Sequence, residues 1–150
     1  MILSDLRPAL VVDASVGIKW FLEEEHGFLA DRLIAGNRYR LNVPDLFLAE
    51  MGNILWKRCR IGEIETRKAK KILTELGKYS IKVWPIQHYA LSAVDLAAAT
   101  GRTYYDCLYL ALGMAIDAPF VTADKKFWNS LKDTPLAKHV CWIEDMDKLG

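Results

Sequence analysis

Two kinds of hydrophobic pattern alternate along the chain. Short apolar runs bounded by Pro, Gly or charged residues are typical of buried strands, and they occur at residues 9–12, 40–43, 81–84, 119–122 and 140–143. Between them, apolar residues recur at helical spacing over residues 15–24, 28–35, 44–59, 65–78, 88–100, 103–117 and 125–131. This alternation predicts an α/β fold with a mainly parallel sheet and helices on both faces.

Local signals place several of the predicted helix ends. Ser15 is a candidate N-cap for a helix that runs to about Glu24. Pro44 suits the first position of a helix, because the amide hydrogen that proline lacks would be unpaired there. Gly101 is expected to end the helix over 88–100. The helix over 65–78 is predicted to point four apolar side chains inward: Ala69, Ile72, Leu73 and Leu76.

The composition is that of a globular protein. The chain has 150 residues, of which 52% are hydrophobic and 26% are charged, and its formal net charge is +1. This length predicts a single domain over residues 1–150, which is large enough to bury a core without disulfides.

Composition and spacing also exclude several classes of protein. The longest uncharged apolar stretch, Cys107 to Ile116, is half of the roughly 20 residues that cross a bilayer, so no membrane partner is expected. Asp5 and Arg7 interrupt the N-terminal segment where a signal peptide needs an apolar run. The cysteines and histidines are scattered, which argues against a disulfide framework or a Cys/His zinc site and favours the cytoplasm.

Four acidic residues stand in apolar surroundings. Asp13 and Asp124 each follow a predicted strand directly. Glu50 interrupts an apolar helical pattern, and Asp106 lies near the start of the most apolar helix. Because ligand sites of open α/β sheets lie at the carboxyl ends of the strands, all four side chains can meet in one crevice there. Buried acids are rare unless they are paired or bound to a metal.

A cluster of four carboxylates carries an electrostatic cost, because like charges raise one another's pKa and destabilise the fold. A hard divalent cation such as Mg²⁺ or Mn²⁺ removes that cost by binding the oxygens. Two such ions can activate a water and stabilise the leaving oxygen of a phosphodiester. Each acid alone also has a structural interpretation. Asp13 can cap a helix, Glu50 can lie on a solvated helix face, and Asp106 can favour a helix N-terminus through the dipole.

The acids lie in four ordered segments, VVDASVGIKWFLEEE, PDLFLAEMGNILWK, YYDCLYLALGMA and VTADKKFW. This ordered set resembles the PIN-domain ribonucleases, and specifically the VapC-type toxins of toxin–antitoxin pairs. The resemblance implies a three-layer α/β/α PIN-like fold, dependence on Mg²⁺ or Mn²⁺, and endonucleolytic cleavage of RNA. It also implies a cognate antitoxin protein that binds the chain, often over the crevice.

The resemblance assigns roles to individual residues. The metal-binding and catalytic acids are Asp13, Glu50, Asp106 and Asp124. Ser15 and Thr122 match hydroxyl positions that support the acids, and both are equally suited to local capping. Asn53 matches an amide expected on the same side of its helix as the nearby acid. Lys125 and Lys126 stand where some members carry a further acid, which leaves open whether the site holds one metal or two.

The segment from Lys57 to Lys82 is strongly basic, with nine Lys and Arg residues against three Glu, a local excess of +6. Beside an acidic, metal-filled crevice, such a surface suits the phosphate backbone of RNA. The candidate RNA-binding residues are Lys57, Arg60, Lys68 and Lys71. A solvated helix face is the alternative for each of them. Any exposed aromatic residues are candidates for a homodimer surface.

These observations favour a metal-dependent endoribonuclease, the toxin of a toxin–antitoxin pair, with RNA as its substrate. Three other functions remain open. The chain is alternatively a PIN fold that has lost catalysis and binds RNA or a partner, a Mg²⁺-binding receiver-like signalling module, or a nuclease that acts on structured DNA. The receiver-like alternative is disfavoured because Asp13 stands alone after the first strand, where such modules carry paired acids.

Overall fold

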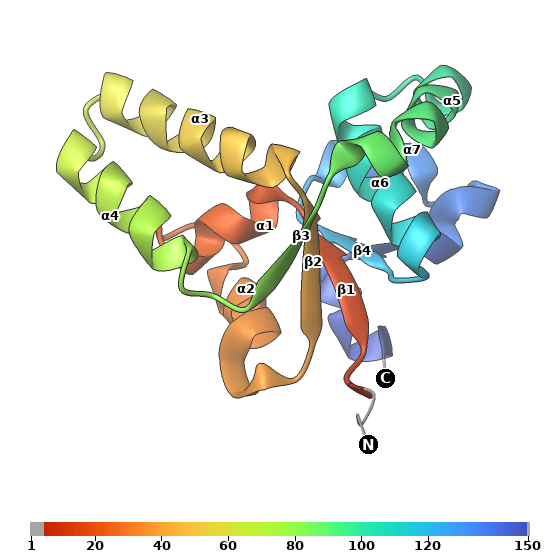
Figure 1. Cartoon of the computed structure of the whole chain (residues 1–150), viewed down its shortest axis with the longest axis horizontal. Helices are drawn as coiled ribbons and strands as arrows, with labels where there is room; N and C mark the ends of the chain where they lie inside the picture. The colour runs from red at the N-terminus through yellow and green to blue at the C-terminus, as the bar shows by residue number, and fades with distance from the viewer. Residues whose placement is uncertain (1–4, 150) are drawn as a thin grey trace.

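The computed structural model describes residues 5–149, and its centre is one parallel sheet (Figure 1). The five strands lie in the order β3-β2-β1-β4-β5, and each neighbouring pair is parallel. Their bounds are Ala9–Val12 (β1), Arg40–Pro44 (β2), Ile81–Trp84 (β3), Phe120–Thr122 (β4) and Val140–Trp142 (β5). The predicted α/β class is therefore confirmed, and all five predicted strands are present.

The central strands are the most apolar because both of their faces are covered. Leu10, Val11 and Val12 of β1 are buried, and so is the whole of β4. β1 pairs with β2 on one side, where Leu10 faces Leu41, and with β4 on the other, where Val12 faces Val121. Since the strands are parallel, β1 and β4 end side by side at the carboxyl edge of the sheet.

Helices cover both faces of the sheet, which confirms the expected three-layer α/β/α arrangement. Figure 1 shows α3 and α4 on one side of the strands and α5 and α6 on the other. The α-helices are Ala14–Gly17 (α1), Gly27–Ile34 (α2), Leu46–Arg60 (α3), Thr66–Leu76 (α4), Ala90–Thr100 (α5), Tyr104–Ile116 (α6) and Lys125–Leu131 (α7). The 3₁₀ helices are Ile18–Trp20 (η1), Ala35–Asn37 (η2), Ile86–His88 (η3), Pro135–His139 (η4) and Ile143–Leu149 (η5).

The first predicted helix is wrong in its start and its length. Its N-cap is Asp13 rather than Ser15, because the Asp13 side chain accepts a hydrogen bond from a backbone amide of the first turn. α1 ends at Gly17 and only the short η1 follows, so the helix stops well before residue 24. The indole N–H of Trp20 donates to the carbonyl oxygen of Ala30 at 2.9 Å. This contact ties the segment to α2, an effect that local periodicity does not show.

Two smaller predictions are also corrected. Pro44 ends β2 instead of starting the helix, because β2 continues to pair with β3 as far as Trp84. α3 then begins at Leu46. Leu73 was expected to point inward but is 38% exposed. The buried face of α4 consists of Ala69, Ile72 and Leu76.

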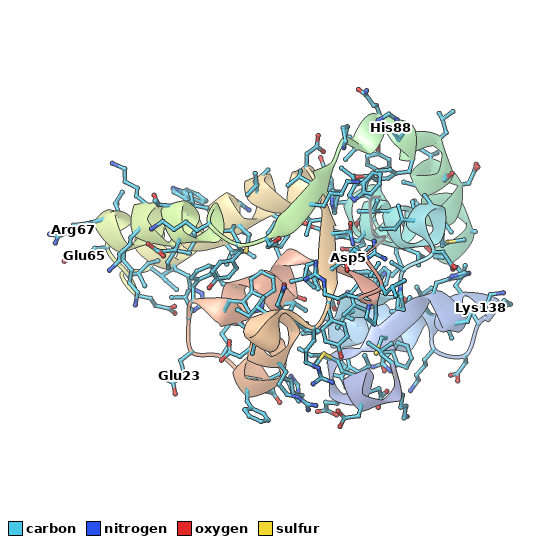
Figure 2. All side chains as sticks on the ribbon, turned by 60° about the horizontal axis from the view of Figure 1, so that its bottom comes forward. Asp5, Glu23, Glu65, Arg67, His88 and Lys138 are labelled. Atoms are coloured by element: carbon cyan, nitrogen blue, oxygen red, sulfur yellow. The ribbon has the colours of Figure 1, made fainter. Side chains whose placement is uncertain are left out.

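α3 and α4 together form an arm that extends away from the sheet (Figure 1). Figure 2 shows Glu65 and Arg67 at the outer end of this arm, on the opposite side of the molecule from Lys138. The basic segment of the sequence therefore lies largely on a projecting pair of helices.

In residues 5–149, no helix is both long enough and apolar enough to cross a membrane.

Cys59, Cys107 and Cys141 carry free thiols, as the scattered spacing predicts. The core of residues 5–149 is one continuous apolar cluster.

The close packing of α1 on α3 generates a prediction. A Cβ atom added to Gly17 would lie 2.7 Å from the Phe47 ring, which is too close for an ordinary contact. We therefore expect Gly17→Ala to lower the free energy of unfolding by about 1–3 kcal/mol, as overpacking does. Gly52 on α3 is the matched control, since its added Cβ would meet nothing within 4 Å. Gly52→Ala should stabilise by about 0.5–1 kcal/mol in urea unfolding. Equal effects of the two substitutions would contradict the packing account.

Candidate functional site

All four candidate acids line one pocket at the carboxyl edge of the sheet, with a volume of about 200 Å³. Two of them come from strand ends: Asp13 follows β1 directly, and Asp124 lies two residues after the end of β4. Glu50 comes from the first half of α3, and Asp106 comes from the first turn of α6. The crevice that the sequence predicted is therefore present.

Asp13 is the most firmly held of the four acids. One carboxylate oxygen accepts hydrogen bonds from the Ser15 hydroxyl and, at 3.1 Å, from the Val16 amide. The other oxygen accepts a hydrogen bond from the Thr122 hydroxyl at 2.8 Å. Asp13 therefore both caps α1 and lines the pocket, because the cap holds the carboxylate at the pocket wall, and its role as a metal ligand stays a prediction.

Thr122 connects the two acids that follow strands. Its hydroxyl, besides donating to Asp13, accepts a hydrogen bond from the Asp124 amide at 3.0 Å. The Asp124 carboxylate caps α7 by accepting from the Phe127 amide at 3.1 Å. Ser15 lies on the pocket wall, and its hydroxyl oxygen accepts from the Ala123 amide at 3.4 Å. The two predicted hydroxyl residues therefore lie beside the acids, as expected.

Tyr109 is a residue of the site that the sequence interpretation missed. Its hydroxyl donates a hydrogen bond to Glu50, and its side chain lines the pocket. The spacing could have indicated this residue. Tyr109 follows Asp106 by three residues on the same helix, and residues three apart lie next to each other on the helix surface. Asn53, which was predicted to face the site, is exposed and does not line the pocket.

Burial and mutual repulsion raise the pKa values of three of the acids. Burial raises the pKa of Asp13 to about 6, and the Glu50 carboxylate adds to the shift, although three hydrogen bonds oppose it. Burial, followed by the charge of Asp106, also raises the pKa of Glu50. The pKa of Asp106 is raised by burial and by Asp124, and is lowered by its Thr103 hydrogen bond and by Arg102. The folded chain thus holds these carboxylates in a setting that disfavours their charged forms.

The donor chemistry of this pocket fits a hard divalent cation. Four carboxyl groups line it, and Mg²⁺ and Mn²⁺ prefer such oxygen ligands. A cation would offset both the burial of these charges and the mutual repulsion that together raise the pKa values of three of them. Within residues 5–149, however, no three acidic, His or Cys side chains converge closely enough to form a complete ligand cluster.

The four candidate RNA-binding residues lie outside the acid pocket. Lys57 and Arg60 are exposed on the second half of α3, and the Arg60 guanidinium lies 5.1 Å from the centre of the exposed Trp56 ring. Lys68 and Lys71 line a different pocket, beside Phe21. Their role in RNA binding stays a prediction.

A comparison with protein families decides the classification. The sequence profile of the PIN domain family matches residues 10–129, a range that contains all four acids of the pocket. The chain belongs to the PIN domain family.

Relatives of this PIN domain agree with the assignment. It is 33% identical to Ribonuclease VapC3 of Pyrobaculum aerophilum over 119 residues, which are 78% of this chain and 90% of the relative. The fold is similar to that of VapC20 of Mycobacterium tuberculosis, described as a sarcin-ricin loop cleaving toxin, with a TM-score of 0.63, 17% identity, and coverage of 81% and 95% of the two chains. The fold is also similar to that of VapBC2 of Rickettsia felis, whose structure is bound to a fragment of promoter DNA. The TM-score is 0.61 and the identity 13%, and the match covers 89% of this chain and 98% of the other.

The electrostatics of the pocket predict the effect of Asp106→Asn on stability. The substitution keeps the shape of the side chain and removes one of the mutually repelling charges. In EDTA at pH 7, we expect the variant to be more stable than the unmodified protein by about 0.5–1 kcal/mol, an estimate reduced for the solvent screening of a partly buried group. Thermal and urea unfolding measure this difference.

The matched control for this prediction is Asp95→Asn, which removes an exposed charge from α5. It should leave the free energy of unfolding almost unchanged. If Asp106 acted mainly on the α6 helix dipole, its replacement would instead lower stability. A metal-free Asp106→Asn variant that unfolds more easily would therefore contradict the repulsion account.

Proposed function

We propose that this PIN domain is a metal-dependent endoribonuclease and the VapC-type toxin of a toxin–antitoxin pair. The observation that supports this most directly is the meeting of four carboxyl groups in one pocket at the carboxyl edge of the sheet. The names of two relatives, Ribonuclease VapC3 and the sarcin-ricin loop cleaving toxin VapC20, favour RNA as the substrate class.

In this proposal the metal ligands, which are also the catalytic residues, are Asp13, Glu50, Asp106 and Asp124. Mg²⁺ or Mn²⁺ held by these residues would supply Lewis-acid chemistry, polarising water and offsetting charge on the phosphodiester. Ser15 and Thr122 keep the Asp13 carboxylate in one orientation, and Tyr109 holds Glu50. Such fixed positions favour an in-line attack because they limit the motion of the reacting groups.

The spacing of the acids and the position of Lys125 bear on whether the pocket would bind one metal ion or two. Because no three of them converge within residues 5–149, we expect metal binding to draw the Asp106 side chain toward Asp13 and Glu50, whose carboxylates are held by hydrogen bonds. Lys125, which stands where a further acid would favour a second ion, places its ammonium group 5.3 Å from the Trp142 ring centre. The four acids would hold one ion in this arrangement, and a second ion would need further oxygen ligands, which the substrate phosphate would supply.

The arm of α3 and α4 is proposed to bind the RNA chain on either side of the cleaved bond. Its cations stand outside the acid pocket, so they suit phosphates that flank the reacting one. The residues proposed for this contact remain Lys57, Arg60, Lys68 and Lys71.

Two protein partners belong to the same proposal. A cognate antitoxin is supported by fold neighbours that are toxin–antitoxin complexes, such as VapBC2. A homodimer is supported by apolar side chains exposed on α5 and α6, where Leu91 is 84%, Val94 56% and Met114 39% exposed. The cytoplasmic location stays a prediction.

The direct test of the function incubates antitoxin-free protein with a labelled RNA that contains single-stranded and hairpin regions. We expect no cleavage in EDTA, internal cleavage after Mg²⁺ or Mn²⁺ is added, and a loss of at least 100-fold in rate for Asp106→Asn, because a metal ligand is removed. Asp95→Asn, purified in the same way, should cleave at the rate of the unmodified protein.

Each outcome of this test has a definite meaning. Cleavage that persists in EDTA, or at equal rates in Asp106→Asn, would mean a metal-independent reaction or a contaminant and would contradict the proposal. A structured DNA of matched sequence serves as a second substrate. Cleavage of the DNA alone would replace the ribonuclease proposal with a DNA nuclease.

A further inference from the structure

One aliphatic side chain stands among the polar groups of the acid pocket. Ile54 lines the pocket together with the four carboxyl groups, and it lies on α3 one turn after Glu50. Among the described residues that line the pocket, it is the only aliphatic one larger than alanine. Its side chain is half-buried, so the core covers it only in part. Ile54 therefore offers an apolar surface to a ligand that otherwise meets carboxyl and hydroxyl groups.

The helix that carries Ile54 connects the pocket to the basic arm. α3 runs from the carboxyl edge of the sheet out into the arm (Figure 1). Lys57 and Arg58 follow Ile54 by three and four residues, so both lie next to it on the helix surface. From Glu50 to Lys57 the helix advances by about 10 Å. An extended chain that leaves the acids along this helix meets the apolar side chain first and a cation next.

The two cations that follow Ile54 differ in what they contact. Arg58 donates through Nη1 to the Glu63 carboxylate at 2.9 Å and through Nη2 to the Glu24 carboxylate, so its charge is used inside the protein. Lys57 is exposed, and among residues 5–149 it takes part in no ion pair. Lys57 is therefore the cation of the two that can bind an external phosphate.

We propose that Ile54 and Lys57 form a nucleotide-binding subsite, in which an RNA base packs on Ile54 and a neighbouring phosphate pairs with Lys57. This inference rests on the proposed ribonuclease function and extends it to the nucleotide beside the cleaved bond. Every base has an apolar face, and isoleucine is among the apolar side chains that proteins place between bases. Because a duplex keeps its bases stacked on one another, the subsite selects unpaired nucleotides.

The first test locates the bound base. The isoleucine δ1-methyl groups are labelled with ¹³C, the Ile54 signal is assigned with Ile54→Val, and a short unpaired RNA is added in EDTA, which prevents metal-dependent cleavage. A methyl group that packs on the face of a base is shifted upfield by the ring current. We expect such a shift for Ile54 with the RNA and none with an abasic strand of equal length. Ile64 is the internal control and should not shift, since it is half-buried in the turn between α3 and α4 and does not line the pocket.

Variants measure the two contacts separately, by fluorescence anisotropy of the same RNA at several salt concentrations. Ile54→Ala should weaken RNA binding about 5-fold, at the lower end of the range for one base contact, and leave both the salt slope and the binding of the abasic strand unchanged. Lys57→Gln should reduce the salt slope by about 0.7, the value for one phosphate contact on a single strand. The controls Ile64→Ala and Lys138→Gln should change neither, because Lys138 is exposed on the opposite side of the molecule from the arm (Figure 2).

The outcomes separate the subsite from the proposed function. If the unmodified protein neither binds nor cleaves RNA, the proposed function fails and the subsite fails with it. If it cleaves RNA but the Ile54 signal stays in place, or moves equally with the abasic strand, only the subsite is overturned. An unchanged salt slope in Lys57→Gln would overturn the phosphate contact. The NMR measurement is made on the unmodified protein, so it decides the base contact even if Ile54→Ala does not fold.

Discussion

The repulsion among four carboxyl groups held at one pocket is the interaction on which the rest of the site depends. Burial, which penalises the charged form of a carboxyl group, is the largest cause of the rise in the pKa of Asp13 to about 6, and the Glu50 carboxylate adds to it. The fold tolerates the unfavourable electrostatic energy of these acids because each one is attached to a strand end or helix whose backbone is held by its own hydrogen bonds. A divalent cation would convert the repulsion into attraction, so the same negative charge that is unfavourable for the fold gives the pocket its capacity to bind a metal.

The parallel sheet is what brings the acids together. β1 and β4 are neighbours that end at the same edge, so the residues that follow them meet although they are far apart in sequence. Thr122 fixes this meeting, because its hydroxyl donates to Asp13 and accepts from the Asp124 amide. α3 and α6 add the other two acids from their first halves, and Tyr109 joins these helices through its bond to Glu50.

The features that depended on local pattern were predictable, and those that depended on distant contacts were not. Apolar runs that are followed by Asp13 and Asp124 predicted both the strands and the pocket. A buried strand and the residue at its end are close in sequence, so the local pattern shows both. α1 ends early, and the segment after it is tied to α2 by the hydrogen bond from Trp20 to Ala30, a contact that periodicity does not contain. Tyr109 resembled a core aromatic, since its ring is buried and stacks on Phe120, and only its hydroxyl reaches the site.

Anomalous diffraction from crystals grown with Mn²⁺ tests the central claim most directly, because it locates the ion without relying on activity. The account predicts a peak in the pocket within about 2.0–2.3 Å of carboxylate oxygens, with ligands drawn from Asp13, Glu50, Asp106 and Asp124. The peak should be lost or much weakened in Asp106→Asn and retained in Asp95→Asn. A pocket that stays empty at millimolar Mn²⁺, or a peak bound elsewhere on the chain, would contradict the account.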